Sequence, residues 1–145
     1  MSSNMNYKGV GIYKNDFPMA RYFFDVKTDN NGLTFIFMWA RNTFRIPIVS
    51  SVRDILYRKK VSGKSPEDLQ KIDERHFYIS YDNVIGLVND TSHKEIQLNS
   101  NIGIVSILFR SKSDYTSFME IMKTNLQSKL FTRDTIEIKP SVYVS

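Results

Sequence analysis

Apolar and aromatic residues occur in short runs along the first third of the chain, in the manner of β-strands. Three runs are rich in aromatic and β-branched side chains and predict strands: residues 8–13, 19–27 and 33–40. Between the last two, Asp29–Gly32 predicts a tight hairpin, because Asn and Gly tolerate positive φ. Apolar residues alternate again in 44–49, which predicts a fourth strand. Pro47 has no amide donor and places that strand at a sheet edge or near a bulge.

The pattern then changes to a helical period. Val52, Ile55 and Leu56 recur at helical spacing and predict an amphipathic helix of about three turns, which Ser62-Gly63 ends. We expect this apolar face to be buried against the protein. A second, polar face, which carries Arg53, Tyr57 and Lys60, is expected to be exposed to solvent. Ser65–Asp68 supplies an N-cap, a proline and acids, and so predicts a second short helix.

The second half of the chain predicts further strands and one long helix. Alternation or short apolar runs indicate strands at residues 76–81, 84–88, 95–98 and 103–109. Ser113 is the expected N-cap of the long helix. Its apolar stripe is predicted to be Tyr115, Phe118, Met119, Met122, Leu126 and Leu130. A last strand is expected in 135–145, where Ile136 and Ile138 precede Pro140.

These elements predict one α+β domain dominated by antiparallel strands, at residues 7–145, after a disordered tail at 1–6. The strands form either two sheets or one bent meander, with a helical insertion and a long C-terminal helix. A bent meander capped by a C-terminal helix resembles pleckstrin-homology-like domains in its order of elements.

Composition supports a folded chain: 41% of residues are hydrophobic, 13% aromatic and 24% charged. Cysteine is absent, which excludes disulfides, thiolate metal sites and cysteine nucleophiles and fits a reducing compartment. No apolar run approaches a membrane span, and no signal peptide is recognisable. We therefore expect a cytoplasmic protein. Its richness in Asn, Lys, Ile and Ser is typical of small viral or bacteriophage accessory proteins and also of many bacterial proteins. A viral origin would place it in the host cytoplasm or the virion.

The excess positive charge lies in one segment. The net charge is +5, and residues 41–64 hold seven basic residues against one acid. This asymmetry predicts an anion-binding surface formed by Arg41, Arg45, Arg53, Arg58, Lys59 and Lys60. The aromatic residues Trp39, Phe44 and Tyr57 are interleaved with these cations, as in proteins that bind single-stranded nucleic acid. The alternative is a solvated helix face, since cations also favour a helix C-terminus.

Catalytic motifs are scarce. His76 and His93 have no partner at metal-ligand spacing, and we expect both at the surface. The chain has no Gly-x-Ser-x-Gly elbow, dinucleotide fingerprint or phosphate loop. A metal-dependent nuclease could use an acid followed by an acid-x-Lys pair. Two sets fit that pattern: Asp16 with Asp25 and Lys27, and Asp134 with Glu137 and Lys139. The helices that flank such a site are missing, and polar alternation on a strand explains the pattern better.

The sequence therefore predicts a non-enzymatic interaction protein that contacts another protein or itself and needs no metal or cofactor. Strand addition at the Pro47 strand or at the tail strand would suit such a role. The candidate interface residues are Tyr57, Tyr78 and Tyr143. Binding of RNA, DNA or another polyanion is the second hypothesis, and the nuclease is the third. The resemblance to pleckstrin-homology-like domains implies that a lipid-headgroup site would draw its cations from the first hairpin. Membrane binding is disfavoured, because that connection offers Lys14 and then Asp16, with Arg21 farther along.

Overall fold

The computed structural model describes residues 4–14, 22–40, 45–126 and 130–132 of the 145-residue chain. These ranges contain eight strands, three α-helices and one short 3-10 turn, η1 (Tyr81–Asn83). The strands are β1 (Met5–Lys14), β2 (Tyr22–Thr28), β3 (Gly32–Ala40), β4 (Phe77–Ser80), β5 (Val84–Asp90), β6 (Glu95–Ser100), β7 (Gly103–Leu108) and β8 (Leu130–Thr132). The helices are α1 (Pro47–Val61), α2 (Pro66–Ile72) and α3 (Lys112–Leu126).

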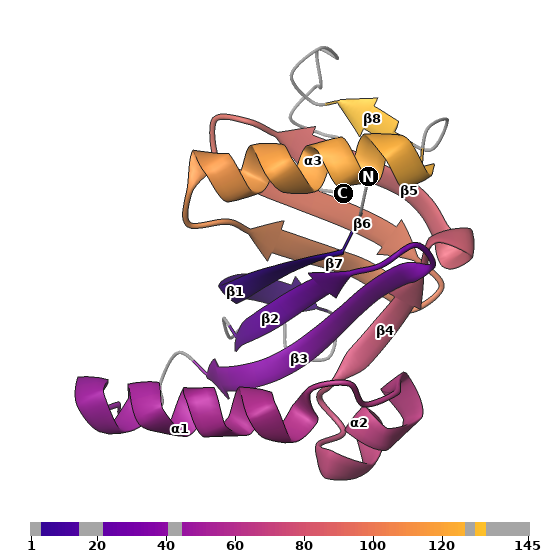
Figure 1. Ribbon diagram of the computed structural model, residues 1–145. Coiled ribbons are helices and arrows are strands. Elements are labelled where there is room, and N and C mark those ends of the chain that lie inside the picture. The colour runs from indigo at the N-terminus through magenta and orange to yellow at the C-terminus, as the bar shows by residue number, and fades with distance from the viewer. Residues whose placement is uncertain (1–3, 15–21, 41–44, 127–129, 133–145) are drawn as a thin grey trace.

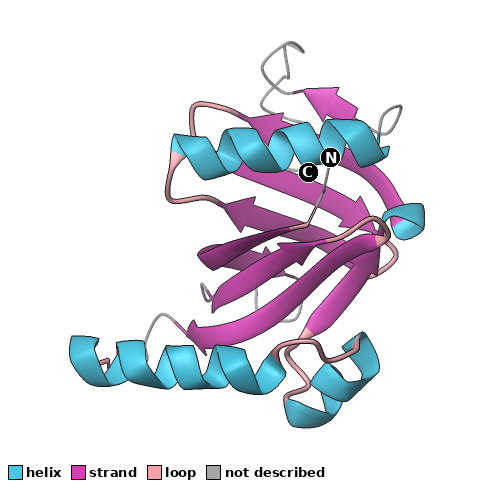
Figure 2. Ribbon diagram, in the orientation of Figure 1, coloured by secondary structure: helices cyan, strands magenta, loops and turns pink. Residues whose placement is uncertain are grey.

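The described strands form one sheet in the order β4-β3-β2-β1-β7-β6-β5-β8. Neighbouring strands are antiparallel throughout, except that β8 lies parallel to β5. The sheet is bent: α3 crosses the half that contains β5, β6 and β7, and α1 lies outside β3 at the opposite end (Figure 1). The antiparallel α+β domain that the sequence predicts is therefore confirmed. Its described strands form one bent sheet, in which β1 and β7 join two runs of sequential strands (Figure 2).

A bulge at Gly9 bends β1. The register between β1 and β2 shifts between Tyr7 and Val10, and Gly9 has a φ of 62°. Glycine suits this position because a side chain is disfavoured at positive φ. Strand β1 begins at Met5, inside the segment 1–6 that the sequence predicts to be a tail.

The main core lies between the inner faces of the bent sheet and α3. Five predicted stripe residues of α3 are buried there: Tyr115, Phe118, Met119, Met122 and Leu126. Two details of the helix prediction were wrong. Ser111 caps α3, because its Oγ accepts the N–H of Asp114 at 3.1 Å, and Ser113 lies inside the first turn. Leu130, expected in the stripe, belongs to β8.

A second, smaller cluster lies on the outer face of β3, where α1 and α2 pack. Its buried residues are Ile36, Val61 and Leu69. Ser65 caps α2 by accepting the N–H of Asp68 at 3.2 Å, as the sequence predicts.

The predicted strand at 44–49 was wrong over its described part, because Pro47, Ile48 and Val49 form the first turn of α1. Pro47 stands at the start of the helix, where a missing amide costs nothing and the fixed φ suits the helix. The apolar alternation at this point belongs to a helix stripe that runs on to Leu56. The tail strand expected in 135–145 lies outside the described residues.

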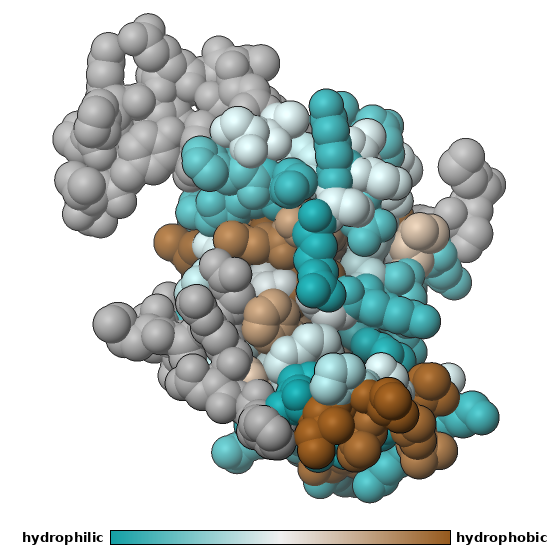
Figure 3. Space-filling view, turned by 90° about the vertical axis from the view of Figure 1, so that its left-hand side faces the viewer, coloured by the Kyte–Doolittle hydropathy of each residue, from teal (hydrophilic) through white to brown (hydrophobic). Residues whose placement is uncertain are grey.

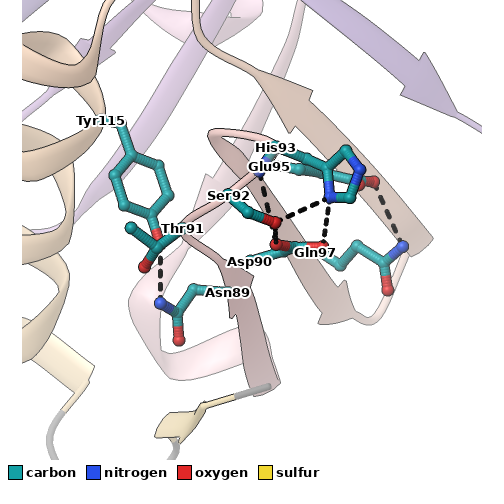
Figure 4. A network of polar contacts seen from close by, with 8 residues as sticks. All are labelled: Asn89, Asp90, Thr91, Ser92, His93, Glu95, Gln97 and Tyr115. Carbon is teal, nitrogen blue, oxygen red and sulfur yellow. Dashed lines mark hydrogen bonds and ion pairs between the residues drawn. The ribbon is translucent and has the colours of Figure 1, made fainter. Parts of the chain in front are cut away.

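The turn between β5 and β6 is fixed by polar contacts to α3 (Figure 4). The Asn89 amide donates to the Tyr115 hydroxyl at 2.6 Å, and the Thr91 hydroxyl lies 3.0 Å from the same oxygen. In the turn itself, the Asp90 carboxylate accepts a hydrogen bond from Ser92 at 2.8 Å. His93 is exposed there, as predicted, and its Nδ1 lies 2.8 Å from Asp90. These contacts join the upper half of the sheet to α3, away from α1.

Candidate functional site

Helix α1 lies on the protein with its polar side inward. The buried residues of α1 are Ser50, Asp54 and Val61. Val52, Ile55 and Leu56 were expected to form the buried face of the helix. This expectation was wrong, because all three side chains are more than half exposed. A soluble helix ordinarily buries its apolar stripe. The outer surface of α1 therefore departs from this ordinary arrangement.

Two ion pairs engage the inner face of α1, and one of them joins the helix to the sheet. The Arg58 guanidinium donates to Asp25 on β2 through Nε at 2.6 Å and through a terminal nitrogen at 3.1 Å. Asp25 is buried and also accepts the N–H of Gly9 in the β1 bulge at 3.0 Å. The hydrogen bond to Asp25 raises the pKa of Arg58, so the guanidinium stays charged. At the start of the helix, Arg45 donates to Asp54 at 2.6 Å.

A buried histidine forms the third polar contact of α1. His76 is fully buried, so the expectation that it lies at the surface was wrong. Its Nδ1 accepts the backbone N–H of Phe37 at 2.8 Å, and its Nε2 lies 2.7 Å from the Tyr57 hydroxyl. Because Nδ1 is an acceptor, the neutral ring carries its proton on Nε2 and donates it to Tyr57. Burial lowers the pKa of His76 below its usual 6.5.

The outer face of α1 carries five aliphatic side chains that we name the aliphatic ridge: Ile48, Val49, Val52, Ile55 and Leu56. Each is between 54% and 79% exposed. Their spacing places them on one side of the helix, over an arc of roughly 120°. Figure 3 shows a concentration of hydrophobic residues over this end of the molecule. Contiguous exposed apolar patches of this kind mark binding sites.

Unpaired cations border the ridge on both sides. On one side, Arg53 lies four residues after Val49, and Lys60 lies four residues after Leu56; both side chains are exposed. Neither forms an ion pair with an acid in the described part of the chain. On the other side, a recess of about 320 Å³ separates α1 from β1 and β2. Its lining includes Lys8, Lys27, Lys59 and Ile55, together with the Asp25–Arg58 pair.

The structure separates the six cations of the predicted anion-binding set. Arg45 and Arg58 are engaged with Asp54 and Asp25. Arg53, Lys59 and Lys60 are exposed, and Arg41 lies outside the described residues. The sequence missed Lys8 and Lys27, which the sheet brings beside Lys59. The available signal was strand alternation, which places Lys27 on the same face as Asp25, but nothing in the sequence shows that α1 covers that face.

The aromatic residues near the cations already have neighbours. Trp39 stacks on Phe23 with ring centroids 5.2 Å apart, and the Arg45 guanidinium lies 4.0 Å over its ring. Tyr57 is half-buried against His76, and Tyr78 is half-buried on β4. Phe44 and Tyr143 lie outside the described residues.

Most residues of the nuclease hypothesis lie outside the described ranges: the acids Asp16, Asp134 and Glu137, and the lysine Lys139. The remaining acid, Asp25, has both carboxylate oxygens engaged by Arg58. Among the described residues, no group of three or more His, Asp or Glu side chains is arranged to hold a metal ion.

In comparisons with known proteins, no family model, no curated protein and no solved structure matched the chain. The described helices also include none with the length and apolar character needed to cross a bilayer.

Proposed function

We propose that this protein is a non-enzymatic cytoplasmic interaction protein that binds another protein through the aliphatic ridge of α1. One observation carries the proposal: α1 turns its polar side to the sheet and exposes five aliphatic side chains. A component of a viral or bacteriophage assembly is the setting that its composition favours.

The energetics support a contact that excludes water from the ridge. Full burial of a Val, Leu or Ile side chain stabilises by about 1.5–3 kcal/mol. The ridge side chains are 54–79% exposed, so covering each one would contribute on the order of 1–2 kcal/mol. Several such contributions exceed the cost of ordering the few side chains involved, which makes the ridge a strong centre for an interface.

A photo-crosslinking experiment tests this function. Benzoylphenylalanine is placed at Val52 in the ridge, or at Ile104 on β7, which is 51% exposed and serves as the matched aliphatic control. In the cells that make the protein, we expect a discrete protein adduct from position 52 and none of that mass from position 104. The captured protein is then purified and bound to the chain and to the Val52→Asn, Leu56→Gln variant, named the ridge double variant. An adduct from both positions, or unchanged binding by the ridge double variant, would refute the proposal.

A polyanion such as RNA or DNA is the second candidate, and the cations around the recess favour it. Lys8, Lys27 and Lys59 line one recess without an acid partner among the described residues. We expect a fluorescent single-stranded oligonucleotide to bind with a steep salt dependence if this candidate is correct, and a Lys8→Ala, Lys27→Ala, Lys59→Ala variant to lose that binding. Absence of binding near physiological salt would eliminate it. The Trp39 ring is already stacked on Phe23 and covered by Arg45, so it is not free to stack on a base. This favours the protein partner over the polyanion.

A further inference from the structure

We infer that the segment that covers the aliphatic ridge is an acidic amphipathic helix of the partner protein. Its apolar stripe packs on the ridge, and carboxylates on its two flanks meet the cations on both sides of α1. This inference deepens the proposed function and rests on it.

The ridge has the repeat of a helix–helix seam. Ile48, Val52, Ile55 and Lys59 follow one another at spacings of four, three and four residues, and Val49 and Leu56 lie beside them. This is the a, d and e pattern by which helices interdigitate in bundles and coiled coils. The helix is 15 residues long, so it presents two full repeats to a partner helix.

The charges around the seam have one sign. Arg53 and Lys60 border it on one side, and Lys8 and Lys27 border the recess on the other. The single acid of α1, Asp54, is buried and paired with Arg45. A partner that covers the ridge must bring these cations into a partly desolvated rim, where only anions can compensate them.

Lys59 and the recess give the partner a specific docking point. Lys59 occupies a seam position, and a lysine there selects a partner that offers a carboxylate. The recess beside it holds about 320 Å³, enough for a Glu or Asp side chain, and Lys8 and Lys27 line its other wall. Arg58 is held in place by Asp25, so the recess keeps its shape and its net positive charge.

A second copy of the chain fits this surface poorly. The middle of the ridge is Val52, so two ridges packed antiparallel would bring Arg53 close to its own copy. The exposed outer face of α1 offers no acid to compensate. A bilayer is also less suited, because the ridge carries no aromatic residue and a flat lipid surface would leave the recess unfilled.

Labelled model helices test the inference by fluorescence anisotropy. The probe is a peptide of about 21 residues with Leu at a, d and e and Glu at the flanking positions, and the matched control has Lys for every Glu. We expect the acidic peptide to bind at least about tenfold more tightly than the basic one at about 150 mM salt. A Lys27→Glu, Lys59→Glu variant should lose most of that preference, because it leaves three cations against two carboxylates around the ridge. The ridge double variant should bind neither peptide, and Ile104→Asn should bind as the parent does.

The outcomes separate this inference from the proposed function. Equal binding of both peptides, a preference for the basic peptide, or no binding of either would overturn the acidic helix. If the Val52 crosslink still captures a ridge-dependent protein, the function stands and only the partner chemistry is wrong. If the crosslink also fails, both are wrong. Binding to phosphatidylserine-containing vesicles that the ridge double variant loses, with no peptide binding, would assign the ridge to a lipid surface.

Discussion

The contact of Arg58 with Asp25 should be the main attachment of α1 to the sheet, and Arg58→Met tests it. Methionine keeps the unbranched apolar stem but removes the guanidinium, which leaves the carboxylate of Asp25 buried with one remaining donor, the N–H of Gly9. Removing one member of a buried ion pair costs about 3–5 kcal/mol. The Arg58 side chain is 25% exposed, and one donor remains, so we expect a loss of about 2–3 kcal/mol.

Urea unfolding followed by circular dichroism measures this loss, and amide exchange shows whether α1 opens first. Lys60→Met is the matched control, because Lys60 is exposed on the same helix, and its effect should stay within about 0.5 kcal/mol. Adding Asp25→Asn to Arg58→Met removes the buried charge and should restore part of the stability. The Arg58–Asp25 pair is not the main attachment of α1 if Arg58→Met is no more destabilising than Lys60→Met, or if the added Asp25→Asn makes the loss larger.

Three further predictions concern the ring, the bulge and the ridge. Because burial lowers the pKa of His76 in the folded protein, His76 is protonated at a higher pH in the unfolded chain than in the folded one. The contribution of neutral His76 to the free energy of unfolding should therefore be fully present above about pH 6.5 and decrease as the pH falls below that value. In urea unfolding at a series of pH values, His76→Asn should weaken this dependence. Gly9→Ala should cost about 1–2 kcal/mol in strain plus a clash with the Trp39 ring, 3.2 Å from the new carbon. Gly63→Ala, also at positive φ but with no atom within 4 Å, should show the strain alone, and equal losses would exclude the clash. The ridge double variant should change unfolding by no more than about 0.5 kcal/mol per substitution. A larger loss would mean that the ridge packs within the chain.

The antiparallel sheet and the core face of α3 could be predicted from the sequence because each depends on local patterns. The stripe from Tyr115 to Leu126 is buried as its spacing predicts. Errors occurred where two patterns overlap in a few residues. In 44–49, apolar alternation and a helical stripe fit equally well, and Pro47 is compatible with an edge strand or a helix start.

The side of α1 that faces the sheet could not be predicted from its sequence. Periodicity shows that a helix has two faces, and the hydrophobic effect normally decides which is buried. In this protein the decision depends on residues far away in sequence. Asp25 and His76 supply partners for Arg58 and Tyr57, and no local pattern near α1 reveals them.

The reversed orientation of α1 is itself the strongest reason to expect a partner. A helix can bury its polar side only if each buried group finds a partner. The Arg45–Asp54 and Arg58–Asp25 pairs and the bond between Tyr57 and His76 supply such partners, and one terminal nitrogen of Arg45 is buried without one. Ion pairs of this kind add little net stability over apolar packing, because desolvation offsets their attraction. Helix α1 thus loses the burial of its aliphatic side chains and gains polar contacts of little net stability. We therefore explain its orientation by the aliphatic ridge that it leaves exposed. The exposed ridge, with cations along both borders, is the surface that we propose binds the partner, and an inward-facing stripe would not present it.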